Sequence, residues 1–178
     1  ALANERDTLE RDPNAPVLGN PEGDITVVEF FDYNCPYCKR AMPEVDALLA
    51  EDGNIRLVMR EWPILSEGSA FAARAALASR KQGKYAELHN ALMGMRGKVE
   101  ADTVLRVAGE IGLDLDRLKA DMQAPEIDDA GLQRLGVDRQ KGRIIGEIGS
   151  GHPVNHSLIR CIRQEVDRKF ARQVPCRI

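Results

Sequence analysis

The stretch ITVVEFFDYNCPYC, residues 25–38, joins an apolar run to two cysteines that stand three positions apart. Its first half is filled by β-branched and aromatic residues, a pattern typical of a strand buried on both faces, with Glu29 as the charged exception. Pro36 suits the first turn of a helix, and apolar residues at helical spacing follow it. The stretch therefore predicts a strand and then a helix that begins next to Cys35.

A second strand and several helices are expected after this point. The segment NIRLVMREWP (54–63) predicts a strand that stops at Pro63, because the residue before a proline avoids helical geometry. Residues 25–64 then form a βαβ unit. Residues 65–130 consist mostly of helical patterns and are expected to form an inserted helical domain.

The two ends of the chain differ from this middle part. Residues 1–24 are expected to be an N-terminal extension whose second half, rich in Pro, Gly, Asn and Asp, is an entry loop. Residues 131–178 hold 10 Lys/Arg against 4 Asp/Glu, whereas residues 1–130 hold 15 against 24. In this divergent basic segment, RIIGEI (143–148) predicts a strand and residues 157–173 predict an amphipathic helix.

Composition excludes several classes of protein. The formal net charge is −3 and 43% of the residues are hydrophobic, which provides for a core. A nucleic-acid binder is not expected, because such proteins need a concentrated basic surface. No run approaches the roughly eighteen apolar residues of a membrane helix, so membrane insertion is not expected either. The polar start of the chain is compatible with an export signal cleaved before Ala1.

The pair Cys35 and Cys38 could bind a metal, staple the fold or exchange electrons. Structural zinc needs four ligands, and the other candidates, Cys161, Cys176 and three histidines, provide no second pair at ligand spacing. A disulfide that closes so short a loop constrains the unfolded chain little, which disfavours a purely structural bridge. At a helix amino terminus, unpaired N–H groups and the helix dipole stabilise a thiolate at Cys35. The pattern favours a reactive thiol pair.

The motif and its surroundings resemble the DsbA-like branch of the thioredoxin superfamily, which consists of exported thiol:disulfide oxidoreductases. The resemblance covers about residues 16–129 and is carried by VVEFFDYNCPYCKRAMPEV (27–45), VMREWPILSEGSAFAARAALAS (58–79) and QGKYAELHNALM (82–93). It implies an α/β thioredoxin-like fold with an inserted helical domain. It also implies a redox-active disulfide with no metal or organic cofactor, cysteine-containing protein substrates, a membrane or soluble redox partner, and a periplasmic or otherwise exported location.

The resemblance further implies roles for single residues. Cys35 would be the nucleophile and Cys38 the resolving thiol, while Pro36 and Tyr37 between them would tune the redox potential. Glu29 would help to move a proton to or from Cys38, and burial should raise the pKa of such a carboxylate. From the residues alone, Glu29 could instead lie at a strand edge that faces water.

After Ala130 the chain departs from the family pattern. The substrate-docking loop with its cis-proline is not found in register, and Pro153 is the candidate for its role, with a cis peptide bond and a position near the Cys35 sulfur. We expect instead a tail that does not rebuild the site, so that the chain keeps a reactive cysteine pair but oxidises protein substrates poorly. The alternatives are a disulfide isomerase or reductase, a non-catalytic thioredoxin-like binding protein, and a thiol protein that binds copper or zinc.

Overall fold

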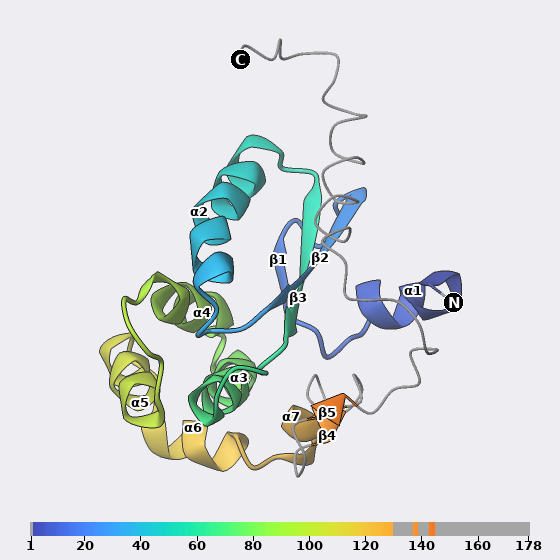
Figure 1. The fold of residues 1–178 in the computed structure, drawn as a ribbon. Coiled ribbons are helices and arrows are strands. Elements are labelled where there is room, and N and C mark those ends of the chain that lie inside the picture. Colours follow the sequence, from blue (N-terminus) through green and yellow to red (C-terminus); the bar gives the residue numbers. More distant parts are fainter. Residues whose placement is uncertain (1, 130–136, 139–142, 145–178) are drawn as a thin grey trace. The chain divides into compact units, whose positions relative to one another are not determined.

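The computed structural model describes residues 2–129, 137–138 and 143–144 of the chain (Figure 1). Its elements, in chain order, are α1 (Leu2–Glu10), β1 (Val17–Gly19), β2 (Ile25–Phe31), α2 (Pro36–Glu51), β3 (Ile55–Glu61), α3 (Glu67–Ser79), the 3-10 turn η1 (Arg80–Gln82), α4 (Tyr85–Gly94), α5 (Ala101–Glu110), α6 (Leu115–Asp121), α7 (Pro125–Asp129), β4 (Val137–Asp138) and β5 (Arg143–Ile144).

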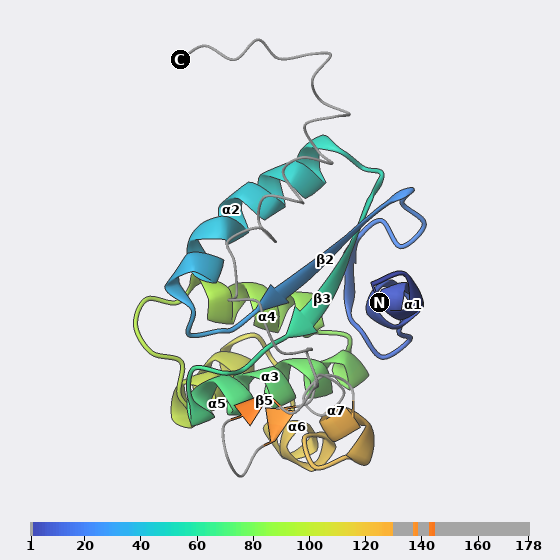
Figure 2. The ribbon, with the colours of Figure 1, turned by 45° about the vertical axis from the view of Figure 1, so that its right-hand side comes forward.

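Three strands form the sheet that carries the cysteine motif, in the order β1-β3-β2. β2 and β3 run parallel, with Glu29 opposite Met59, and α2 connects them. Figure 2 shows α2 running along the sheet. The helix packs against the core through Met42, Val45 and Leu49. The predicted βαβ unit is confirmed.

Two sequence predictions about this sheet are wrong. The expected entry loop contains β1, which pairs antiparallel with β3 and places Val17 opposite Val58. A strand of three residues is too short to show a period in the sequence. β2 is not buried on both faces, since Phe31 is its one buried residue and Phe30 is 40% exposed. Within the described residues β2 pairs with β3 alone, so one of its edges has no described neighbour.

The C-terminal segment is described only in part. Of the strand predicted at residues 143–148, the structure describes Arg143–Ile144, which pairs antiparallel with β4 and not with β2. The helix predicted at residues 157–173 and the docking role of Pro153 fall outside the described residues. These expectations stay predictions.

The helices after β3 begin and end at residues suited to those positions. Ser66 caps α3, because its hydroxyl accepts a hydrogen bond from the Ser69 N–H at 3.0 Å. Asp114 caps α6 in the same way, accepting from the Arg117 N–H at 3.0 Å. Gly83 follows η1 with φ 69°, a left-handed conformation that glycine adopts without strain. Separate helices are confirmed here, while their standing as a domain of their own stays a prediction.

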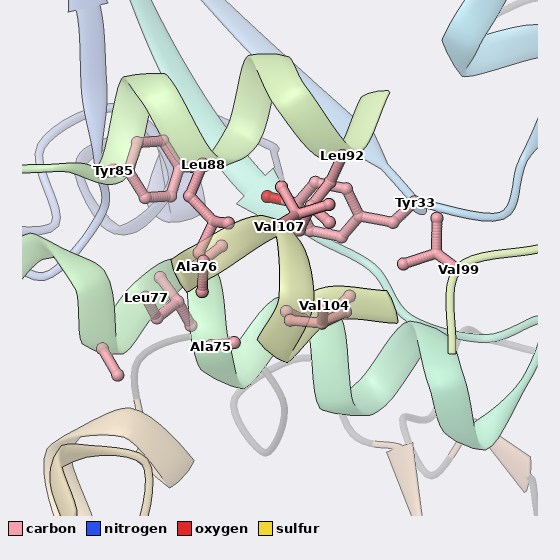
Figure 3. Packing of buried hydrophobic residues seen from close by; sticks show 14 of the residues in the cluster. Tyr33, Ala75, Ala76, Leu77, Tyr85, Leu88, Leu92, Val99, Val104 and Val107 are labelled. Atoms are coloured by element: carbon pink, nitrogen blue, oxygen red, sulfur yellow. The ribbon is translucent and has the colours of Figure 1, made fainter. Parts of the chain in front are cut away.

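The core is shared between the sheet and these helices. α3 brings small side chains to it, which let neighbouring helices approach closely. Its buried alanines are Ala72, Ala73, Ala75, Ala76 and Ala78. Figure 3 shows side chains of α3, α4 and α5 meeting in one cluster that also holds Tyr33. Tyr33 is 1% exposed, so the chain is anchored in the core two residues before the cysteine motif.

The N-terminal helix is fastened to β3 by a buried arginine. Arg60 donates hydrogen bonds to the carbonyl oxygens of Thr8 and Leu9. These carbonyls lie at the C-terminal end of α1, where backbone acceptors lack helical partners and the helix dipole is negative. The Arg60 guanidinium also forms an ion pair with Asp12 at 2.9 Å. The extension is therefore a packed part of this fold.

Candidate active site

Cys35 is the N-cap residue of α2. Its backbone is extended (φ −78°, ψ 115°), Pro36 is the first residue of the helix, and the Cys38 N–H donates to the Cys35 Sγ at 3.4 Å. Both cysteines are partly exposed free thiols. Backbone N–H groups that point at a sulfur stabilise negative charge on it. The predicted position of Cys35 is confirmed.

Cys38 differs from Cys35 in its environment. Burial raises the pKa of the Cys38 thiol to about 12, helped by its hydrogen bond with Cys35 and by the nearby charges of Cys35 and Glu29. The Cys38 thiol therefore keeps its proton at neutral pH. The two sulfurs therefore differ, since that of Cys35 accepts a backbone hydrogen bond at the start of α2 while burial disfavours charge on that of Cys38.

Glu29 lies on the face of β2 that α2 covers. It lines a small hollow together with Met42, Asp46 and Met59, among others. Burial raises the pKa of the Glu29 carboxyl, and the Asp46 carboxylate raises it further. Because the charge of Glu29 in turn raises the pKa of Cys38, the protonation states of the two groups are linked. Glu29 is thus partly buried instead of facing water, and its expected pKa direction is confirmed.

Asp32 holds the turn that precedes Cys35. It is 5% exposed. Its Oδ1 accepts from the Asn34 N–H and the Ser69 hydroxyl, each at 2.7 Å, and its Oδ2 accepts from the N–H groups of residues 64–65 at 2.9 and 3.0 Å. Its carbonyl accepts from the Cys35 N–H at 2.9 Å. A buried carboxylate needs such partners, and these ones join the cysteine turn to the segment that follows β3.

Asn34 joins the same turn to the inserted helices. Its amide pairs with the backbone of Val99, donating to the carbonyl at 3.0 Å and accepting from the N–H at 2.7 Å. It also donates to the hydroxyls of Ser66 and Ser69 at 3.1 and 3.0 Å. The sequence analysis identified neither Asn34 nor Asp32, although a D-x-N pattern directly before the first cysteine was the available signal.

Comparison with known proteins places this geometry in a family. Residues 26–134 match the DSBA-like thioredoxin domain. The chain belongs to this family. A thioredoxin-like oxidoreductase from Silicibacter pomeroyi DSS-3, known from its crystal structure, is 67% identical with a TM-score of 0.69, over 70% of this chain and 72% of that one. A periplasmic thioredoxin-like protein from Salmonella enterica serovar Typhimurium is 25% identical with a TM-score of 0.59, over 70% and 75%.

The DSBA-like domain also resembles part of a much longer curated protein. The Na(+)/H(+) antiporter NhaA 1 of Salinispora arenicola is 39% identical over 105 residues, which is 58% of this chain and 16% of the antiporter. The chain spans less than a fifth of the length of the curated relatives it matches. The similarity is therefore to one portion of those proteins.

Membership in the DSBA-like family confirms the α/β thioredoxin-like fold, and the similar protein from Silicibacter pomeroyi is a thioredoxin-like oxidoreductase. In the part of the chain that the structure describes, no three His, Cys, Asp or Glu side chains gather as metal ligands would. No helix there is long and apolar enough to cross a membrane. Pro153, Cys161 and Cys176 lie outside the described residues.

The two residues between the cysteines face outward. Pro36 is exposed, and Tyr37 is 73% exposed. The Arg40 guanidinium lies over the Tyr37 ring, 4.7 Å from its centroid. Their influence on the redox potential stays a prediction.

A buried polar cluster backs the cysteine turn. The Tyr33 hydroxyl lies 3.2 Å from His89 Nδ1, the Tyr85 hydroxyl donates to Glu61 at 2.7 Å, and the rings of Tyr85 and His89 stack. Burial lowers the pKa of His89 to about 4 and raises the pKa of Glu61 to about 7, although its hydrogen bond from Tyr85 opposes the rise. Burial therefore disfavours the charged form of both groups, so that His89 is neutral at pH 7 while Glu61 ionises near that pH.

Glu61 should make the stability of the fold depend on pH. Its carboxyl has a pKa of about 7 in the folded chain against a reference of 4.5, so its contribution to stability is complete below about pH 4.5 and is lost as the pH rises through 7. Glu61→Gln, whose amide oxygen can still accept from Tyr85, should remove roughly 2 kcal/mol of the fall in unfolding free energy between about pH 5 and 8. Urea unfolding of both proteins at the two pH values measures this. His89 is present in both proteins, so its contribution to the pH dependence cancels in the comparison. If the unfolding free energies of the two proteins depend on pH in the same way, the prediction is contradicted.

Proposed function

We propose that this chain catalyses thiol–disulfide exchange, with Cys35 as the sulfur that bonds to substrate and Cys38 as the resolving thiol. The observation that carries the proposal is the asymmetry of the pair. The Cys38 N–H donates to the Cys35 Sγ, while the pKa of the Cys38 thiol is raised to about 12. A sulfur that accepts a backbone hydrogen bond at a helix amino terminus is the better leaving group in thiol–disulfide exchange.

In the oxidising direction, a substrate thiolate attacks the Sγ of Cys35 in the Cys35–Cys38 disulfide. The bond between the two cysteines breaks, and Cys38 leaves and takes up a proton. A second substrate thiolate then attacks the substrate sulfur of the mixed disulfide, and Cys35 leaves. The two substrate thiolates lose two electrons, and the chain gains these electrons as the Cys38 thiol, which has taken up one proton, and the Cys35 thiolate. Glu29, whose pKa is raised by burial and by the Asp46 carboxylate, is the acid proposed to protonate Cys38.

The proposed substrates are cysteine-containing proteins outside the cytoplasm. The periplasmic relative from Salmonella supports this location. A membrane-bound or soluble redox partner would then reoxidise the pair. The disulfide itself is the reagent, so the scheme needs neither a metal nor an organic cofactor. An isomerase or a reductase would use the same two sulfurs. A reductase would pass two electrons to the substrate, and an isomerase would cause no net oxidation or reduction of it.

The test uses the oxidised chain and an excess of a reduced, unstructured peptide with two cysteines. We expect one peptide disulfide per chain and two new thiols on the chain, counted by mass spectrometry after alkylation. No peptide disulfide would contradict the proposed function. A reduced, unfolded protein should react more slowly than the peptide if the tail does not rebuild the docking loop. Equal efficiency would overturn that expectation, and Pro153→Ala would then show whether this proline is responsible.

A further inference from the structure

Residues 95–99, the 95–99 loop, are held beside the cysteine turn at both ends. Lys39 Nζ donates to the Met95 carbonyl oxygen at 2.9 Å. At the other end, the Asn34 amide pairs with the Val99 backbone at 2.7 and 3.0 Å. Because residues 34 and 39 stand on either side of the two cysteines, both ends of the loop are tied to the segment that carries the reactive pair.

The middle of this loop carries two exposed cations. Arg96 and Lys98 flank Gly97, whose φ of 86° lies in the left-handed region that favours glycine. Arg40 is also exposed, and Lys39 is partly exposed. We call Lys39, Arg40, Arg96 and Lys98 the basic rim. It joins α2 to a loop more than fifty positions further along the chain.

The basic rim is not neutralised within the two segments that form it. Residues 34–40 and the 95–99 loop contain no Asp or Glu. The three exposed members of the rim form no ion pair with any residue that the structure describes. Their charges are therefore available to a molecule that approaches the cysteine pair.

The surroundings of the rim have the opposite sign of charge. Two exposed acids stand at the helix starts next to it, Glu67 on α3 and Glu100 before α5. Residues 1–130 as a whole hold 15 Lys/Arg against 24 Asp/Glu. A locally positive patch on an acidic body steers anionic partners to one place and repels them elsewhere.

We propose that the basic rim is a docking surface that favours substrate segments whose cysteine is flanked by acidic side chains. This inference rests on the proposed function, because it names the substrate class of the same cysteine pair. The rim acts on encounter and orientation, while Cys35 and Cys38 carry out the exchange. Exposed charges of this kind change association rates strongly with salt.

The experiment measures how fast reduced two-cysteine peptides reduce the oxidised chain at low ionic strength. The peptides differ only in the flanking residues, which are Asp, Asn or Lys. Rates are expressed per peptide thiolate, because acidic neighbours raise the pKa of the peptide thiols. We expect the Asp peptide to react about tenfold faster than the Asn peptide, the Lys peptide to be slowest, and the preference to fade in about 0.5 M salt.

The double variant Arg96→Gln/Lys98→Gln should lose most of the preference for the Asp peptide. The control Arg106→Gln/Lys119→Gln removes the same amount of charge from exposed positions on α5 and α6. This control should keep the preference for the Asp peptide. Absence of a preference in the unchanged chain, or equal loss in both double variants, would overturn the inference. Uncharged dithiothreitol should reduce the Cys35–Cys38 disulfide at the same rate in all three proteins. If dithiothreitol does not reduce this disulfide in the unchanged chain, that result would count against the proposed function.

Discussion

A Cys38→Ser variant should capture a substrate sulfur on Cys35 and fail to release it, so that a covalent complex accumulates. In the unchanged chain, Cys38 sits one helical turn from Cys35, and its backbone N–H already touches the Cys35 sulfur at 3.4 Å. Resolution is therefore intramolecular. Removing the resolving sulfur removes this intramolecular route, and we expect release to slow by at least about a thousandfold.

The complex is measured as an intact mass after the reduced variant is mixed with a disulfide-containing peptide. Cys35→Ser is the matched control. It should form no complex through Cys38, because burial, the largest cause of the raised pKa of this thiol, is retained in the variant and keeps the thiol protonated. A complex that forms on Cys38 in the control as readily as on Cys35 in the first variant would show that the roles are assigned the wrong way round.

The sequence predicted the elements that depend on local patterns. The β2–α2–β3 unit and the place of Cys35 at a helix start follow from an apolar run, a proline and helical spacing, and the structure confirms them. Capping residues such as Ser66 and glycines such as Gly83 also act within a few positions of themselves.

What the sequence did not predict depends on contacts between distant positions. Asp32 and Asn34 look like ordinary turn residues, and their importance lies in hydrogen bonds to residues 64–65, Ser69 and Val99. The exposure of β2 likewise depends on which strands lie beside it, a property that the hydrophobicity of the strand does not encode. The same limit applies to the basic rim, whose two halves are brought together by the fold.

Glu29→Gln should slow the exchange by about a hundredfold while largely preserving the fold, if the carboxyl carries the proton of Cys38. The side chains of glutamate and glutamine have nearly the same shape, so packing in the hollow between β2 and α2 is retained in the variant. The rate at which a reduced peptide releases Cys38 is the quantity to compare, measured across pH. Glu44→Gln, which changes an exposed acid on α2, is the control and should leave the rate unchanged.

The sign of the Glu29→Gln effect separates two roles for this residue. The negative charge of Glu29 raises the pKa of Cys38, so removing it should make the Cys38 thiolate easier to form. If Glu29 acted through its charge alone, the variant would release Cys38 faster than the unchanged chain. If Glu29 delivers the proton, the variant is slower despite the easier ionisation, and the inflection in the pH profile above the ordinary glutamate range disappears. We expect the second result, and a faster variant would contradict the role of Glu29 as proton carrier.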